Sequence, residues 1–118
     1  MNERQLHKSV FELLQWENPA CVWYPVPNYS GNLGPKLGRK LKEQGVRKAG
    51  VPDFVFHWKG GSGFIELKAG QNNLSEPQRK FRDRCAELEI PFRVCRGQDE
   101  VVKTLTEWGV LERRDAGQ

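Results

Sequence analysis

The chain has 118 residues, of which 37% are hydrophobic and 29% are charged, and this composition is typical of one globular domain rather than of a disordered or fibrous protein. Nineteen basic residues against 15 acidic ones give a net charge of +4 and a pI near 9.1, which weakly favours an anionic partner. No apolar run approaches the roughly 18 residues that cross a bilayer, and the first residues lack the apolar stretch of a signal peptide. We therefore expect a cytoplasmic protein without a membrane partner.

The first predicted element is an amphipathic helix over residues 3–16, with Asn2 as its N-cap. At about 100° per residue, Glu3 falls on the same stripe as His7, Val10 and Leu14. A glutamate on an otherwise apolar stripe requires a reason, which makes Glu3 a candidate site residue. The alternative is that Glu3 is only the frayed first residue of the helix.

Residues 21–26 predict a strand, and residues 27–50 predict a long loop because they are rich in Gly, Pro, Asn and Lys. Within residues 36–48 there are six basic side chains and one glutamate. Such a run is often only solvated surface, but beside a site with two carboxylates, which the chain offers further on, it suggests an arm that contacts phosphates and becomes ordered on the substrate. The predicted DNA contacts of this arm are Lys36, Arg39, Lys40, Lys42, Arg47 and Lys48.

Two strands, 53–58 and 63–69, are predicted next and are joined through residues 59–62 as a hairpin. Asp53 and Glu66 lie at the ends of these strands, and both supply the hard oxygen ligands that magnesium prefers. Lys68 is two residues past Glu66, so that both side chains point to the same face of the strand. The pattern indicates a metal-dependent phosphodiesterase site, although Asp53 could be a turn residue and the other two an exposed strand face.

A helix from Ser75 to about residue 89 is predicted by a capping box, with Ser75 as the cap and Gln78 three residues later. The inward stripe of this helix should contain Gln78 together with Phe81, Cys85 and Leu88. Gln78 is the second polar residue on a stripe that should be apolar, so it is a candidate site residue even if it also completes the capping box.

A second basic cluster on this helix consists of Arg79, Lys80, Arg82 and Arg84. Because the cluster follows the two carboxylates directly, we predict that Arg79 and Lys80 contact DNA phosphates.

The chain ends with a predicted strand over residues 92–95, a helix over 99–108 and a flexible tail over 113–118. The order α-β-β-β-α-β-α predicts a single α/β domain over residues 1–112 with a small mixed sheet flanked by helices. Three cysteines without Cys-x-x-Cys spacing argue against disulfides or structural zinc and predict reduced thiols, at least partly in the core.

Pro52-Asp53, twelve residues, and then Glu66-Leu67-Lys68 resemble the PD-(D/E)xK nuclease superfamily, which has a restriction-endonuclease-like core. Within it the chain resembles the VRR-NUC (virus-type replication-repair nuclease) family over roughly residues 3–95. The matching stretches are Glu3 with the apolar residues to Leu14, Pro27-Asn28, residues 49–53, residues 63–68 and Leu74-Ser75-x-x-Gln78.

The resemblance implies that Asp53 and Glu66 bind Mg²⁺ or Mn²⁺, and that Lys68 assists catalysis. It assigns Glu3 as a further metal ligand and Gln78 as a late active-site residue, and the backbone carbonyl of Leu67 is an additional candidate ligand. His7 departs from the glutamine that we expect at its position, and it could contact DNA or the site.

Small standalone members of this family, which can be virus- or phage-encoded, are similar to homodimeric endonucleases that cut four-way (Holliday) junctions. The resemblance therefore implies a metal-dependent endonuclease with branched DNA as substrate and a second copy as partner. Two alternatives stay open, namely a DNA-binding module without catalysis and a restriction-type nuclease acting on linear duplex. The short chain leaves little room for a separate recognition domain, which favours reading of DNA shape.

Overall fold

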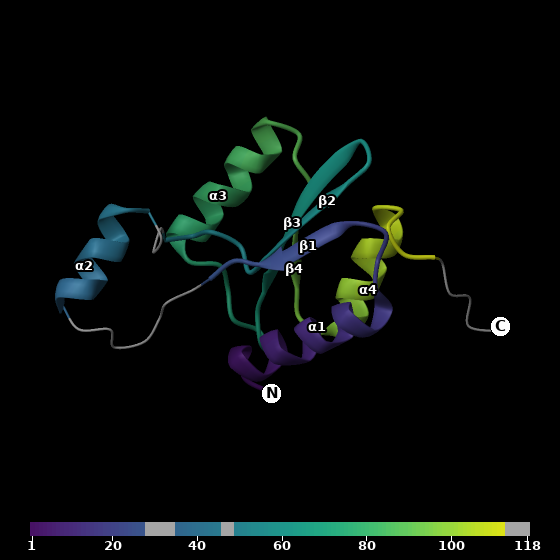
Figure 1. Cartoon of the computed structure of the whole chain (residues 1–118), viewed down its shortest axis with the longest axis horizontal. Coiled ribbons are helices and arrows are strands. Elements are labelled where there is room, and N and C mark those ends of the chain that lie inside the picture. The colour runs from purple at the N-terminus through teal and green to yellow at the C-terminus, as the bar shows by residue number, and fades with distance from the viewer. Residues whose placement is uncertain (28–34, 46–48, 113–118) are drawn as a thin grey trace.

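The computed structural model describes residues 1–27, 35–45 and 49–112, and it shows a mixed sheet flanked by helices (Figure 1). The sheet order is β1-β2-β3-β4, with two antiparallel pairs followed by the parallel pair of β3 and β4. The predicted α/β class and mixed sheet are confirmed, and the architecture is consistent with a restriction-endonuclease-like fold. The elements in chain order are α1 (Glu3–Glu17), β1 (Val22–Pro25), α2 (Pro35–Glu43), β2 (Phe54–Trp58), β3 (Gly61–Leu67), α3 (Glu76–Glu87), β4 (Phe92–Cys95) and α4 (Gln98–Glu107).

The predicted hairpin is present as β2 and β3, although its turn is only Lys59-Gly60. Gly60 has a φ of 92°, a conformation that favours glycine. Phe54 and Phe56 are two residues apart in β2, so their side chains point to the same face of the sheet, and both are fully buried. The hairpin therefore forms the centre of the sheet and carries most of its apolar side chains.

Three helices cover the sheet from two sides, with α1 and α4 together on one face and α3 on the other (Figure 1). The core between α1, α4 and the sheet contains Leu6, Val10, Leu14, Phe54, Phe56, Ile65, Val101 and Leu105. The predicted cap of α1 is confirmed, because the Asn2 side chain accepts a hydrogen bond from the Gln5 backbone N–H. The three cysteines are free thiols, with Cys85 and Cys95 buried, as predicted.

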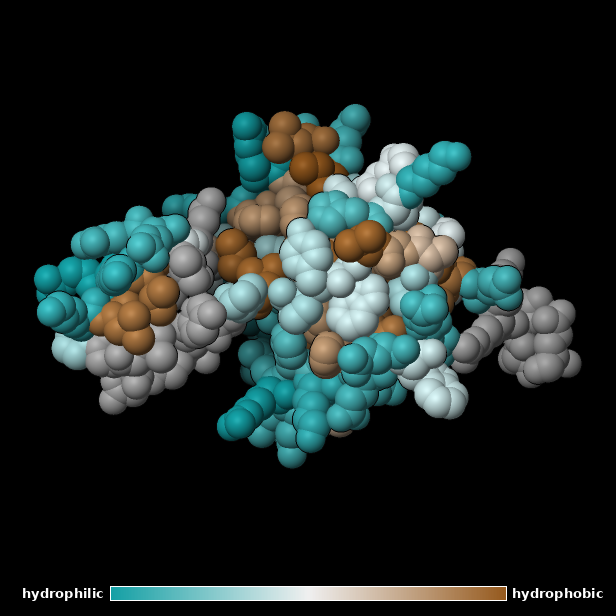
Figure 2. All heavy atoms as spheres, viewed as in Figure 1, coloured by the Kyte–Doolittle hydropathy of each residue, from teal (hydrophilic) through white to brown (hydrophobic). Residues whose placement is uncertain are grey.

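The predicted capping box of α3 is also present, with Ser75 and Gln78 as its two members. Phe81 packs edge-on against Phe64 of β3 with 5.2 Å between the ring centroids. The prediction that Leu88 points inward is wrong, because α3 ends at Glu87 and Leu88 is the C-cap residue, 53% exposed. Figure 2 shows hydrophobic surface at this end of α3.

The prediction of a loop over residues 27–50 is wrong for residues 35–43, which form α2. Pro35 begins the helix, where its fixed φ is compatible with helical geometry, and Leu37 and Leu41 lie one turn apart. None of the residues of α2 is buried. It stands apart from the sheet in Figure 1, and Figure 2 shows mostly hydrophilic surface over it.

Four of the predicted DNA contacts, Lys36, Arg39, Lys40 and Lys42, therefore lie on an exposed basic helix. Arg47 and Lys48 lie outside the described residues. Within residues 1–27, 35–45 and 49–112, no helix is long and apolar enough to span a membrane.

Candidate active site

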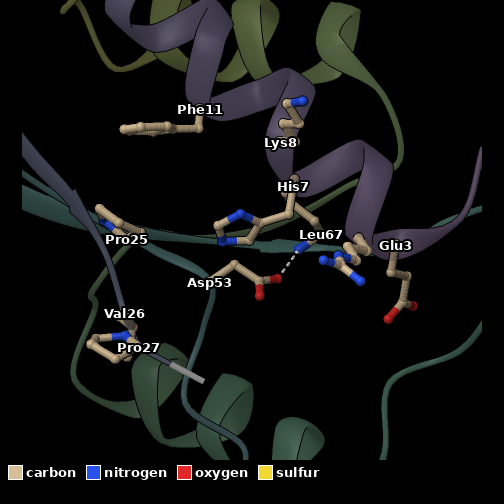
Figure 3. Close-up of a pocket in the computed structure, with 10 residues that line it drawn as sticks. Glu3, His7, Lys8, Phe11, Pro25, Val26, Pro27, Asp53 and Leu67 are labelled. Atoms are coloured by element: carbon tan, nitrogen blue, oxygen red, sulfur yellow. Dashed lines mark hydrogen bonds between the residues drawn. The ribbon is translucent and has the colours of Figure 1, made fainter. Parts of the chain in front are cut away.

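Asp53 lies immediately before β2, where the ends of three strands meet. Its backbone N–H donates to the Ile65 carbonyl (3.1 Å) and its carbonyl accepts from the Val26 N–H (2.9 Å). Its side-chain Oδ2 accepts a hydrogen bond from the Leu67 N–H at 2.7 Å, drawn as the dashed line in Figure 3. These bonds fix the Asp53 carboxylate against the C-terminal end of β3.

Glu66 lies on β3 and is only 4% exposed. Its Oε1 accepts a hydrogen bond from Nε2 of Gln78 at 2.9 Å, so α3 contributes directly to the site. The Gln78 Oε1 simultaneously accepts from the Ser75 backbone N–H at 2.8 Å. The two roles proposed for Gln78 are thus compatible: one end of its amide caps α3, and the other end orients Glu66.

Lys68 follows the last residue of β3 and is 8% exposed. Its Nζ lies 3.8 Å from Oε1 of Glu3, and the Asn72 Nδ2 lies 3.5 Å from the same oxygen. Glu3 thus reaches the site through Lys68. The prediction that Glu3 lies on a buried stripe is wrong, since its side chain is 47% exposed and the buried stripe of α1 begins at Leu6.

A pocket of about 720 Å³ opens beside Asp53, between the first turns of α1 and the end of β1 (Figure 3). His7 lies over Asp53 in this view, and its ring stacks on Phe54 with 4.7 Å between the ring centroids. Arg4 and Lys8 also line this pocket, and neither was a sequence candidate. The helical spacing i, i+4 could have identified them, because it places both on the side of α1 that carries His7.

The two carboxyl groups of the site disturb each other's ionisation. Burial and the negative charge of Asp53 raise the pKa of Glu66 to about 8, although the Lys68 ammonium opposes this shift. Burial also raises the pKa of Asp53, against the opposing effect of its hydrogen bond from Leu67. Two neighbouring anions, one buried and one half-buried, are unfavourable without a cation, so the site is suited to a positively charged ligand.

The donor set fits a hard divalent cation. One oxygen of each carboxylate accepts from an N–H donor, and the remaining oxygens of Asp53 and Glu66, with the Leu67 carbonyl, are the ligand types of Mg²⁺ and Mn²⁺. Among the described residues, no group of three or more His, Cys, Asp or Glu side chains lies close enough to hold a metal ion. Magnesium usually binds through one or two carboxylates and retains several waters, so two carboxylates suffice.

Glu66 should make the metal-free protein less stable as the pH rises. Its pKa is about 8 in the folded state, against 4.5 for a freely solvated glutamate, so the folded state binds more protons between these values. Stability from this group is therefore present below about pH 4.5 and is lost as the pH rises through about 8. In EDTA, we expect the Tm of Glu66→Gln minus that of the wild type to grow by on the order of 5 °C from pH 5 to pH 8. A constant difference would show that Glu66 keeps an ordinary pKa.

Gln78→Ala tests the contact from α3. Because the change removes a hydrogen bond to a buried carboxylate, we expect cleavage to slow by on the order of tenfold. Ser75→Ala is the matched control, since it weakens the same capping box but leaves the amide of Gln78 beside Glu66. It should lower stability by about 1 kcal/mol and leave the cleavage rate unchanged. Equal rates for both variants would assign Gln78 to capping alone.

A mixed sheet that brings a half-buried aspartate together with a buried glutamate and lysine at one edge is consistent with a restriction-endonuclease-like nuclease. The sequence model of the VRR-NUC domain matches residues 2–99, a range that includes Glu3, Asp53, Glu66, Lys68 and Gln78. The chain therefore belongs to the VRR-NUC family, and its function is of the nuclease type, with DNA as substrate. Comparisons with curated proteins and with solved structures gave no match.

Proposed function

We propose that this chain is a divalent-metal-dependent DNA endonuclease, in which Asp53 and Glu66 bind Mg²⁺ or Mn²⁺. The observation that carries the proposal is the pairing of the half-buried Asp53 carboxylate with the buried Glu66 carboxylate, with the buried Lys68 beside them. A non-catalytic DNA-binding module would have no use for such a pair, because burying two anions together costs stability.

Some residues of the site would bind the metal or the phosphate, and others position those residues. A metal ion held there would neutralise charge on the scissile phosphate and supply an activated water. Asp53 is oriented by the Leu67 N–H and Glu66 by Gln78, so both carboxylates are preorganised. The Lys68 ammonium would stabilise the negative charge that develops on the phosphate or orient the attacking water.

Glu3 contacts Lys68 in this structure, which favours a role in positioning that lysine. Its assignment as a third metal ligand stays a prediction, and the two roles are separable by experiment.

We propose branched DNA, in particular a four-way junction, as the substrate. The described elements of the chain form one sheet with its helices, and α2 presents four exposed cations that can follow a phosphate backbone without reading bases. Because one chain offers one active site, paired cuts across a symmetric junction would need two copies, and we therefore propose a homodimer.

The test is a cleavage panel with a synthetic four-way junction, a flap, a splayed arm and a linear duplex, each in Mg²⁺, Mn²⁺ or EDTA. We expect the wild type to cut the junction fastest and only with metal, and Asp53→Ala and Lys68→Ala to be inactive. Equal cleavage by all three proteins would refute the mechanism. Defined cuts on linear duplex would favour the restriction-type alternative, and tight binding without cleavage would favour the non-catalytic one.

The proposed homodimer is tested separately, by measuring the mass of the protein in solution.

A further inference from the structure

A second polar pocket lies one strand along from the carboxylates, at the end of β4. β3 and β4 are parallel, with Leu67 opposite Cys95, so Lys68 and Arg96 leave the sheet at the same edge. The Lys68 N–H donates to the Cys95 carbonyl at 3.1 Å, which joins the two strand ends. Neighbouring strands lie about 4.8 Å apart, so the residue that follows β4 is a close neighbour of the active site.

Three arginines line this pocket, which has a volume of about 400 Å³. Arg79 and Arg82 come from successive turns of α3, and Arg96 comes from the end of β4. The remaining lining residues are uncharged and are Asn73, Leu74 and Val94. The pocket therefore combines positive charge with an open volume, and none of the described residues that line it is acidic.

Backbone carbonyls hold two of these guanidinium groups in place. Arg96 Nη1 donates to the carbonyls of Gly70 (2.9 Å) and Asn72 (2.8 Å), and Arg79 Nη1 donates to that of Leu74 (2.7 Å). Among the described residues, neither arginine has a carboxylate within ion-pair distance. Carbonyl oxygens orient a guanidinium group without cancelling its charge, so both groups are preorganised for an anion.

The loop that these arginines hold also reaches the active site. It connects Lys68 to α3, and its Asn72 side chain contacts Glu3 while the Asn72 carbonyl accepts from Arg96. A ligand bound by Arg96 and Arg79 would thus lie against the loop that begins after Lys68 and contacts Glu3.

We propose that Arg79, Arg82 and Arg96 form a second phosphate subsite, which binds a DNA phosphate other than the scissile one. Guanidinium forks bind phosphate oxygens in pairs, and three of them at one concave position suit a phosphate group better than a base edge. The proposal rests on DNA as the substrate, and it adds a fixed contact that would set the register of the strand across the carboxylates.

Two other basic residues of α3 do not join the subsite. Lys80 and Arg84 lie on a different side of the helix, along an apolar groove, and they pair with Glu76 (3.5 Å) and Glu87 (2.7 Å). Arg82 also forms an ion pair, with Asp83 at 3.0 Å. Arg84 is therefore a control on the same helix with the same charge and a comparable ion pair, but it lies outside the pocket and is more exposed (68% against 46%).

The test is binding of a labelled blunt duplex in EDTA, where metal-dependent cleavage cannot occur, measured by fluorescence anisotropy over a range of salt concentrations. We expect the double variant Arg79→Ala/Arg96→Ala to bind the duplex about tenfold more weakly than the wild type does. The slope of log K against log salt should be smaller by about one. Arg82→Ala should also weaken binding and reduce the salt slope, whereas the affinity of Arg84→Ala should stay within about twofold of that of the wild type. If the double variant and Arg82→Ala have the same salt slope and affinity as Arg84→Ala, the proposal is overturned.

Two further controls separate this result from other causes. Arg96 also holds the loop, so thermal melting must accompany its variant. Among the described residues, Arg82 forms an ion pair with the neighbouring Asp83 and no hydrogen bond to the loop, so its variant tests the subsite without disturbing the loop. Duplexes with and without 5′-phosphates identify the source of the phosphate, because loss of a preference for the phosphorylated duplex assigns a terminal phosphate and equal losses on both assign the backbone. A wild type that binds in this way but does not cleave would refute the proposed function and leave the subsite supported.

Discussion

Asp53→Asn is expected to slow metal-dependent cleavage by about a thousandfold or more while leaving the folded protein at least as stable as the wild type. The amide can still accept the hydrogen bond from the Leu67 N–H, so the geometry at the end of β3 should persist. The substitution removes the half-buried carboxyl group of Asp53, whose own pKa is raised by partial burial and whose negative charge raises the pKa of Glu66. The same change therefore removes a metal ligand and relieves an electrostatic cost.

The measurements are single-turnover cleavage at saturating Mg²⁺ and thermal melting in EDTA at pH 8. Asp99→Asn is the matched control, because Asp99 is an exposed aspartate in the first turn of α4, remote in sequence from Asp53, Glu66 and Lys68. It should leave the cleavage rate within about twofold of the wild type, as for an ordinary surface substitution. If Asp53→Asn cleaves DNA as fast as the wild type, Asp53 is not a metal ligand. A large loss of stability would show instead that its charge supports the fold.

Opposite effects on activity and stability are the expected signature of a site that is strained in the absence of its cation. Added Mg²⁺ should therefore raise the Tm of the wild type more than that of Asp53→Asn, because only the wild type retains both carboxylates.

Local signals in the sequence were sufficient where a short stretch of chain decides the structure. The caps at Asn2 and Ser75 depend on contacts three residues apart, and both were predicted correctly. The hairpin of β2 and β3 was equally clear, because a Gly-Gly pair separates two apolar runs. These elements place Asp53, Glu66 and Lys68 near one another, so the centre of the candidate site could be found from the sequence.

The helix α2 could not be found in this way. Its only apolar side chains are Leu37 and Leu41, and a pair one turn apart does not establish a helical period against the surrounding Gly, Pro and Lys. No tertiary packing marks it either, since none of its residues is buried.

Contacts across the sheet edge were also beyond the sequence. Arg96 follows a strand that could have paired in either direction, and only the parallel alignment of β3 and β4 brings it beside Lys68. Asn72 reaches Glu3 across 69 positions of sequence, for which no local pattern exists. Helical periodicity placed Glu3 on the correct side of α1, but it could not show that the stripe becomes exposed in the first turn.

Lys68→Met is expected to slow cleavage by on the order of a hundred- to a thousandfold, because it removes the ammonium group from the buried edge of the site. Methionine retains a similar length, so a fold intact by circular dichroism would exclude a packing defect. Loss of the positive charge should also raise the pKa of Glu66 further, because Lys68 now lowers it. The pH at which metal binds should accordingly move upward, since the metal must displace a more tightly held proton.

Glu3→Gln then separates the two roles open to Glu3. Glu3 lies 3.8 Å from the Lys68 ammonium and is half-exposed, so an effect through that lysine should lower the cleavage rate about tenfold at saturating Mg²⁺ without moving the Mg²⁺ midpoint. If Glu3 instead binds the metal, the midpoint should rise and excess Mg²⁺ should restore the rate. The double variant with Lys68→Met gives the decisive comparison. A residue that acts only through Lys68 has no further effect once the lysine is absent, whereas a metal ligand weakens the remaining activity again.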